Sequence, residues 1–516
     1  DFVETRAAID FSPYVGYRIN AINYEVLPIF NPRDPDESNW LYRLANWLHV
    51  DTRDKTLHKK MIIQPGESLS LETLLENERL RRGNDYLVDS MIVPQRVCGN
   101  DIDLLVVVRD IWTLSPTVTA SRSGGEESTG AGVSESNLLG TGQKLSLGYF
   151  QDSDRSGTVY SFGSPQIVER VNFGTTIYKN SDGDVIKYDL IRPFYELNST
   201  WAAGIYGLSS KSIQTIKQNN VEINRYNRNI DDVEMFVGWS PGRQHDHVNR
   251  WLLGYTENID SFDALPDTVS TPVGETIRYP WLGWSYQQDR FLTAENINRT
   301  HRQEDIQLGY SHSVRLGYAS TRYGSDSNVY TFDLSMNYSA YLEPYHLISA
   351  RLYGNGQGDR DEFVNTFFGG GLNYVYIIND KNRWYLSSYF DGGANIRQDE
   401  QLTTGGLENL RGYPNDFQRG NRRWVASAER RRFTDWHIFN LMYFGFAGYL
   451  DVGRAWDTDT PGAASTDTLA DVGVGIRLSP SKFRIDKVIH VDIARPLINV
   501  DEVDSYQLII TGSVDF

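Results

Sequence analysis

The sequence contains a single cysteine, no long apolar run and a minority of cationic side chains. Cys98 alone excludes an internal disulfide and a CxxC metal site. No stretch reaches the roughly 18 consecutive apolar residues of a membrane-spanning helix. The 50 Lys and Arg residues are outnumbered by 67 Asp and Glu, which gives a net charge of -17. This charge repels phosphate and argues against nucleic acid as a partner.

What the chain does contain is strict alternation, clearest between Leu410 and Phe516. In the run Met442–Gly453, Phe444 and Phe446 fall on one face of a strand, whereas Ala447 and Asp451 fall on the other. The second face carries Gly, Ala and isolated charges, which suits a confined polar interior. A soluble sheet, the alternative, would show solvated Lys, Glu and Thr there. Apolar-out and polar-in strands predict a transmembrane antiparallel β-barrel.

The composition of residues 117–516 fits the same prediction. The chain has 31 Tyr, 12 Trp and 44 Gly, and barrels carry aromatic girdles at both membrane interfaces. At about 25 residues per strand and loop, this region predicts about 16 strands. The alternating segments number more than that, so some of them are expected to be loops. Residues 121–136, rich in Gly, Ser and Glu, are predicted to be a domain boundary or the first long loop.

Residues 1–116 follow a different pattern, β-α-α-β-β, which predicts one small α+β domain. The second helix is the best defined, because Ser70 can cap its start and Gly83 its end. The sheet edges of such a domain can accept an extended peptide by strand addition, or the domain can be a rigid spacer. The predicted elements are strand 17–27, a helix from Trp40 capped by Ser38 or Asn39, helix 71–82, and strands 87–97 and 101–110.

No catalytic or metal-binding motif of the sequence lies in the local structure that its chemistry requires. Gly238-Trp-Ser-Pro-Gly242 matches G-x-S-x-G, but it follows a strand into a hairpin turn, and Pro241 lacks the backbone N–H that an oxyanion hole needs. The His residues form no ligand pair on a helix. We therefore expect no enzymatic activity, no cofactor and no bound metal.

The segment 402–421 is the candidate functional loop. It is rich in Gly and contains Arg411, Gly412 and Tyr413. The strands that follow place the carboxylates of Asp451, Asp471 and Asp492 on their polar faces. An Arg brought into that interior would form charge-assisted, bidentate pairs, whereas at the surface it would be a solvated cation.

At these residues the chain resembles the BamA/TamA-type outer-membrane proteins, also called bacterial surface antigens, over nearly its whole length. The resemblance implies a 16-stranded barrel (residues 117–516) preceded by one periplasmic POTRA-like domain (residues 1–116). It also implies that loop 402–421 folds inward and that Arg411 pairs with Glu429 and Asp451. The segments that carry the resemblance are 137–142, 189–194, 405–413, 425–429, 449–456 and 471–477.

This resemblance implies a protein of the Gram-negative outer membrane that inserts or translocates protein clients. The N-terminal domain would capture a client by strand addition, and a weak seam between the strands at 117–122 and 505–516 would admit it to the membrane. Expected partners are outer-membrane lipids, unfolded outer-membrane or secreted proteins, and periplasmic or lipoprotein factors. The alternative is a polar-lined channel plugged by loop 402–421, with no insertase activity.

Overall fold

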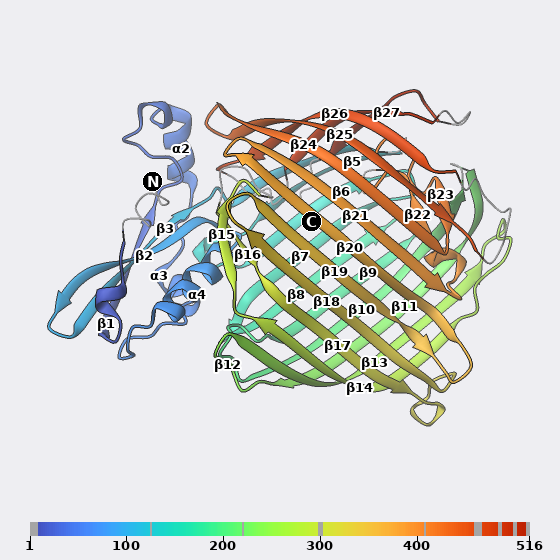
Figure 1. The fold of residues 1–516 in the computed structure, drawn as a ribbon, viewed down its shortest axis with the longest axis horizontal. Coiled ribbons are helices and arrows are strands. Elements are labelled where there is room, and N and C mark those ends of the chain that lie inside the picture. The colour runs from blue at the N-terminus through green and yellow to red at the C-terminus, as the bar shows by residue number, and fades with distance from the viewer. Residues whose placement is uncertain are drawn as a thin grey trace.

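The computed structural model describes residues 9–123, 126–218, 221–297, 303–406, 409–458, 467–482, 488–498 and 503–511. Two parts are visible in Figure 1: a small N-terminal domain and a wide barrel of tilted strands. The N-terminal domain lies against one end of the barrel, which we call the near end; the opposite end is the far end. The chain is mainly β, as predicted.

The N-terminal domain is a three-stranded sheet with helices between its first and second strands. The parallel pair β1–β3 and the antiparallel pair β2–β3 place β3 at the centre. Helix α4 begins after Ser70, whose hydroxyl accepts from the N–H of Thr73, and it ends at Gly83 as predicted. The structure has one helix more than the predicted pattern, α3. The elements are β1 (Arg18–Leu27), α2 (Trp40–Leu48), α3 (Asp54–Lys59), α4 (Leu71–Arg82), β2 (Leu87–Cys98) and β3 (Asp101–Asp110).

This domain has an apolar core. The central strand β3 contributes Leu104, Val106 and Val108, all fully buried, and Leu74 of α4 packs into the same cluster. Burial of such side chains contributes about 1.5–3 kcal/mol each to folding, so the sheet and α4 hold together as in any soluble domain.

The barrel is built from neighbouring strands paired in antiparallel fashion. Most are joined by short hairpins, so strands adjacent in sequence are adjacent in space (Figure 1). The strands are β4 (Leu114–Ser123), β5 (Glu126–Glu135), β6 (Lys144–Gln151), β7 (Ser156–Val168), β8 (Val171–Asn180), β9 (Gly183–Arg192), β10 (Trp201–Gln218), β11 (Val221–Trp239), β12 (Arg243–Gln244), β13 (His247–Ala264), β14 (Glu275–Gln288), β17 (Gly309–Ala319), β18 (Val329–Leu342), β19 (His346–Gly358), β20 (Phe363–Asn379), β21 (Asn382–Ala394), β24 (Arg422–Ile438), β25 (Met442–Trp456), β26 (Leu469–Pro480), β27 (Ile489–Pro496) and β28 (Gln507–Thr511).

The predicted count of about 16 strands is too low. Over the described residues the ring contains 21 strands, of which β12 is a two-residue bridge. The prediction assumed about 25 residues per strand and loop, but many connections are far shorter. Only two residues separate β8 from β9, and only two separate β20 from β21.

The prediction of a boundary or long loop at 121–136 is also wrong. Residues 126–135 form strand β5, which pairs with β4 over ten positions and with β6. Its small and polar side chains lack the apolar alternation used to recognise strands. The backbone ladder forms nonetheless, because an antiparallel neighbour on each side satisfies its N–H and C=O groups.

The two faces of the barrel wall differ as the alternation predicts. Large apolar side chains such as Leu316, Leu352 and Leu372 stand exposed on the outside. Charged and small side chains, including Asp451 and Asp492, lie buried on the inside. The wall therefore has its apolar surface outward, opposite to the N-terminal domain.

Over the described residues, the shortest strand pairing of the ring lies where its last strand meets its first. Residues 512–516, which the sequence predicts to continue the last strand, lie outside those residues. The pair β10–β11 extends over 18 positions, with one register shift, and β11–β13 extends over 14. Between β28 and β4, the described residues form one pair, Ile510 with Arg122. We call this junction the seam.

The N-terminal domain touches the near end of the barrel at several connections spread around the ring. Asn137 donates to Thr52 at 2.7 Å, and the hydroxyl of Tyr195 donates to the carbonyl of Lys60 at 3.0 Å. On another side, Lys482 forms an ion pair with Glu37 at 2.6 Å. The domain is therefore docked across the near-end opening (Figure 1).

Among the helices of the described ranges, none has the length and apolar character needed to cross a membrane.

Candidate functional site

The candidate site is built by the connection between β21 and β24, which folds back into the barrel. Within it, β22 (Leu402–Thr404) pairs with β23 (Gln418–Gly420), and the loop between them carries Arg411. Gly405 starts this loop at φ +115°, where a Cβ atom would lie 1.9 Å from the carbonyl oxygen of Pro414. Only glycine allows the chain to turn there.

Arg411 meets two carboxylates on neighbouring strands of the wall. Its Nε and Nη2 donate to the two oxygens of Asp451 at 2.7 and 2.9 Å, a bidentate pair, and its Nη1 donates to Glu429 at 2.8 Å. The guanidinium carbon also lies 3.2 Å from the ring centroid of Tyr449. The structure thus brings together Arg411, Glu429 and Asp451, and all three are buried.

Further buried charges extend this cluster along the wall. Arg431 donates to Glu429 at 2.5 Å, and Arg477 reaches Glu429 at 3.3 Å and also pairs with Asp492. Asp451 lies directly opposite Asp471 in the β25–β26 register. Two carboxylates in that position repel each other when both are ionised, and the guanidinium of Arg411 offsets that repulsion.

Gly412 and Tyr413 fix the tip of the loop against the same wall. A Cβ atom on Gly412 would lie 2.5 Å from the Cβ of Asp471, so no larger residue fits without displacing the wall. The hydroxyl of Tyr413 has one proton, which the carbonyls of Ala470 and Ile498 share at 3.0 and 3.2 Å. The ring of Tyr413 packs with Leu410, fully buried. The tip is thus held by the ion pairs of Arg411, by the close contact of Gly412 with the wall and by the buried ring of Tyr413.

The loop also reaches the opposite side of the ring. Asn415 donates to Glu126 of β5 at 3.0 Å, and Arg419 donates to the carbonyl of Lys217 of β10 at 3.0 Å. Since β10 and β24 lie about half the ring apart, the loop crosses the lumen.

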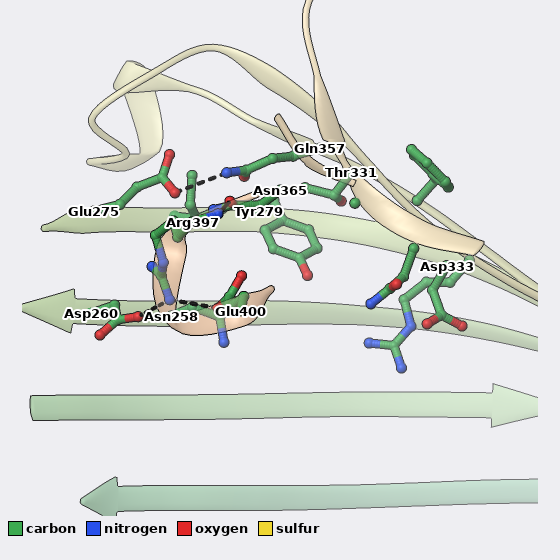
Figure 2. Close-up of a pocket in the computed structure, with 15 residues that line it drawn as sticks. Asn258, Asp260, Glu275, Tyr279, Thr331, Asp333, Gln357, Asn365, Arg397 and Glu400 are labelled. Carbon is green, nitrogen blue, oxygen red and sulfur yellow. Dashed lines mark hydrogen bonds and ion pairs between the residues drawn. The ribbon is translucent and has the colours of Figure 1, made fainter. Parts of the chain in front are cut away.

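A second anchor of the same connection borders a polar cavity (Figure 2). Arg397, just before the short 3-10 helix η5 (Gln398–Glu400), pairs with Asp260 of β13 at 2.9 Å and with Glu400. The cavity beside it measures about 320 Å³. Across it, Gln357 donates to Glu275 at 2.8 Å.

The lumen is also entered from the near end, by a hairpin of β15 (Phe291–Glu295) and β16 (Gln303–Gln307). Ile297, just beyond β15, is buried in a cluster with Leu347 and Val375 of the inner wall. The hydroxyl of Tyr385 donates to the carbonyl of Ile297. The guanidinium of Arg431 stacks on the same Tyr385 ring at 4.2 Å.

The outer side of this hairpin binds the N-terminal domain. Arg82 of α4 donates from Nε and Nη2 to the carboxylate of Asp305 at 2.8 and 2.7 Å, and Arg79 lies 3.7 Å from the ring centroid of Phe291. The hairpin therefore connects the domain to the barrel interior.

Neither this hairpin nor the full charged cluster was predicted from the sequence. Arg477 could have been included, because it lies on the polar face of its strand with Asp471. No sequence signal connects Arg82 to Asp305, which are 223 residues apart.

The G-x-S-x-G stretch forms a turn between β11 and β12, as the sequence analysis expected. Ser240 is buried; its hydroxyl donates to the carbonyl of Asn249 at 2.7 Å and accepts from the N–H of Gly242 at 3.1 Å. These bonds stabilise the turn.

Comparisons with known proteins identify the fold. The chain is similar to CdiB from Escherichia coli, with 13% identity and a TM-score of 0.50 over 97% of this chain and 78% of that chain. It is also similar to CdiB from Acinetobacter baumannii (12% identity, TM-score 0.49, 96% and 74% covered) and to BamA from Haemophilus ducreyi lacking POTRA domains 1–3 (15% identity, TM-score 0.40, 96% and 84% covered). No family model and no curated protein sequence matches the chain. The predicted resemblance to BamA/TamA-type barrels is confirmed at the level of the fold, for which the Escherichia coli protein is the evidence.

Proposed function

We propose that this chain is an outer-membrane barrel that inserts or translocates protein clients, with the seam as its working part. Its N-terminal domain lies in the periplasm and acts as a single POTRA unit. The required energy comes from pairing strand edges that cannot stay unpaired in lipid, so no catalytic residue or cofactor is needed. The partners are outer-membrane lipids, unfolded outer-membrane or secreted proteins, and periplasmic or lipoprotein factors.

The observation that carries this proposal is the contrast between the seam and the rest of the wall. Over the described residues, β28 and β4 share one pair, whereas β27 and β28 share five and β4 and β5 share ten. Counted over the described residues, this junction has the shortest ladder of the ring, and we propose that it is the one that opens. An incoming strand that pairs with the edge of β28 or of β4 forms ladder hydrogen bonds that the described residues of these two strands do not form with each other.

The N-terminal sheet offers a place for strand addition. The outer edge of β1 is bridged at Arg18 by Ser68, and Glu78 accepts from the N–H of Ile92 on the edge of β2. Beyond that bridge, the rest of β1, as far as Leu27, has no second strand beside it among the described residues. We propose that an extended client segment adds to β1 at this edge.

The test is a reversible lock on the seam. In a Cys98→Ser background, Arg122→Cys and Ile510→Cys face each other and can form a disulfide across the junction. Val491→Cys with Ile510→Cys is the matched control, since it locks the adjacent β27–β28 pair. We expect oxidation of the seam pair to abolish client insertion and reduction to restore it, with the control unaffected. Full insertion by the oxidised seam variant would refute the proposal.

The alternative is a plugged channel, favoured by the polar cavity of about 320 Å³ beside Arg397. Against it, the described lumen is entered from the far end by loop 402–421 and from the near end by the β15–β16 hairpin. Steady ion conductance in planar bilayers, unchanged by the seam lock, together with no loss of insertion, would favour the channel.

A further inference from the structure

Helix α2 of the N-terminal domain is amphipathic, but its apolar face points away from the domain. Its two Trp and three Leu residues all fall within an arc of about 120° when the helix is drawn at 3.6 residues per turn. None of them is buried, and Trp47 is 77% exposed. The apolar residues are Trp40, Leu41, Leu44, Trp47 and Leu48.

The polar side of the helix is the side that packs. Asn46 accepts from the N–H of Phe30 at 3.1 Å and donates to its carbonyl at 2.8 Å, and the ring of Tyr42 stacks on that of Phe30 at 4.4 Å. A helix of a water-soluble domain is oriented the other way, with its apolar face on the core. These contacts fix α2 with its Trp and Leu side chains outward.

Helix α2 is also fastened to the rim of the barrel. The hydroxyl of Tyr42 donates to the carbonyl of Phe439 at 2.6 Å, and Asn440 donates to the carbonyl of Asp36 at 2.9 Å. Figure 1 shows α2 beside the near ends of β24–β26. At this corner, Trp436 of β24 and Phe439 in the turn after β24 are both largely exposed. Helix α2, with its exposed apolar face, therefore lies next to the apolar outer surface of the barrel.

We infer that α2 is an in-plane membrane anchor that lies in the near-end leaflet of the bilayer, with phospholipid covering its apolar face. Trp side chains prefer the headgroup boundary, and a short helix with one apolar face binds there. The exposed Arg43 flanks the apolar arc, where its guanidinium can reach lipid phosphate. The anchor fixes the N-terminal domain beside the barrel rim, next to β24–β26.

This inference rests on the proposed membrane location of the barrel, so its test carries a separate check on that location. In the full chain with Cys98→Ser, an environment-sensitive fluorophore is attached at Leu48→Cys, Leu75→Cys or Leu372→Cys. Leu48 and Leu75 are matched leucines, 56% and 52% exposed. Leu75 lies on the face of α4 that carries Arg79 and Arg82, toward the near-end opening. Leu372 reports the outer wall.

The labelled proteins are reconstituted in phosphatidylethanolamine–phosphatidylglycerol vesicles, with a lipid-borne nitroxide or aqueous iodide as quencher. We expect the labels at 48 and 372 to emit at shorter wavelength, to be quenched by the lipid nitroxide and to be shielded from iodide. The label at 75 should be quenched by iodide.

Three outcomes would overturn the inference. If the label at 48 behaves like that at 75 while the label at 372 reports lipid, α2 is not an anchor, although the barrel location stands. If the label at 372 also reports water, the proposed location itself fails. If the label at 48 is shielded from both quenchers and transfers energy to a label on another copy, a second copy of the chain covers the helix.

Discussion

The N-terminal domain and the barrel bury opposite kinds of side chain: the domain buries apolar residues and the barrel buries charged ones. In the domain, Leu104 and Val106 lie inside. In the barrel, Leu372 stands outside, and Arg411, Glu429 and Asp451 lie inside. The comparison teaches that mean hydropathy, -0.46 for this chain, cannot distinguish the two designs. What distinguishes them is which face of the strand carries the apolar residues and whether the other face is confined.

The largest expected effect is a charge placed in the apolar core. Leu104→Asp should destabilise the N-terminal domain by more than about 4 kcal/mol, because a carboxylate there has no partner. Limited proteolysis should cut the domain while the barrel keeps its heat-modifiable migration in gels. Val97→Asp, on an exposed position of the same sheet, is the control and should stay resistant. Loss of the barrel together with the domain would mean that the two parts do not fold separately.

The reverse experiment removes a charge from the polar interior. Arg411→Ala leaves Asp451 and Glu429 without this cation and should cost about 3–5 kcal/mol, the usual penalty for breaking a buried ion pair. Urea unfolding in vesicles measures the loss, and protease access to loop 402–421 should increase. Arg322→Ala, at an exposed far-end position, should change neither. Wild-type stability of Arg411→Ala would show that the lumen is solvated like an open surface.

The contact between the two parts should depend on pH. Burial raises the pKa of Asp305, but the hydrogen bonds and charge of Arg82 lower it more, so the net pKa is below its usual value. The pair then contributes about 1.5–3 kcal/mol to docking at neutral pH, and this contribution is lost as the pH falls through the lowered pKa.

A spin label at Leu75→Cys (with Cys98→Ser) can follow this docking. Its mobility should rise once the pH falls below about 4, the usual pKa of Asp. Arg82→Ala should show the mobile spectrum already at neutral pH, without a step in acid, whereas Arg96→Ala should match the wild type. A step of the same size in Arg82→Ala would assign the pH dependence to other groups.

The smallest effect is expected on the outer wall. Leu372→Asp should destabilise the barrel by about 1–2 kcal/mol in lipid, since acidic side chains at mid-wall cost less than basic ones. Asn373→Asp, the next residue and on the inner face, should have less effect. Equal effects of the two would remove the distinction between the faces. Unfolding in urea from vesicles of one lipid composition measures both.

How well the sequence predicted the fold depended on local signals. Helix α4 was predicted at its observed limits because its caps are local. The strong alternation at 382–394 predicts a strand there, and β21 has these limits. The predicted number of strands was too low, because the number depends on the lengths of the hairpin connections. The alternation of residues does not reveal those lengths. The alternation at 304–319 predicts one strand; the structure divides this segment at Leu308 into β16 and β17, although the sequence offers no change of pattern there.

The candidate site was predictable only where a motif existed. Arg411, Gly412 and Tyr413 stand together in sequence, and the resemblance supplied Glu429 and Asp451 as partners. The anchors at Arg397 and the β15–β16 hairpin depend on residues that the fold alone brings near. Asp260 and Arg397 are of ordinary types at unremarkable positions, so no pattern selects them.

The Tyr385 side chain connects the two inserts of the lumen. Its hydroxyl holds the hairpin at Ile297, its ring supports Arg431, and Arg431 shares Glu429 with Arg411. Under the proposed function, a client that pulled the hairpin out would remove the support of Arg431. Through the shared carboxylate of Glu429, it would also weaken the contacts of Arg411 in loop 402–421. Release of the β15–β16 hairpin at the near end would in this way lower the work needed to release loop 402–421 at the far end. The two ends of the lumen would therefore tend to open together.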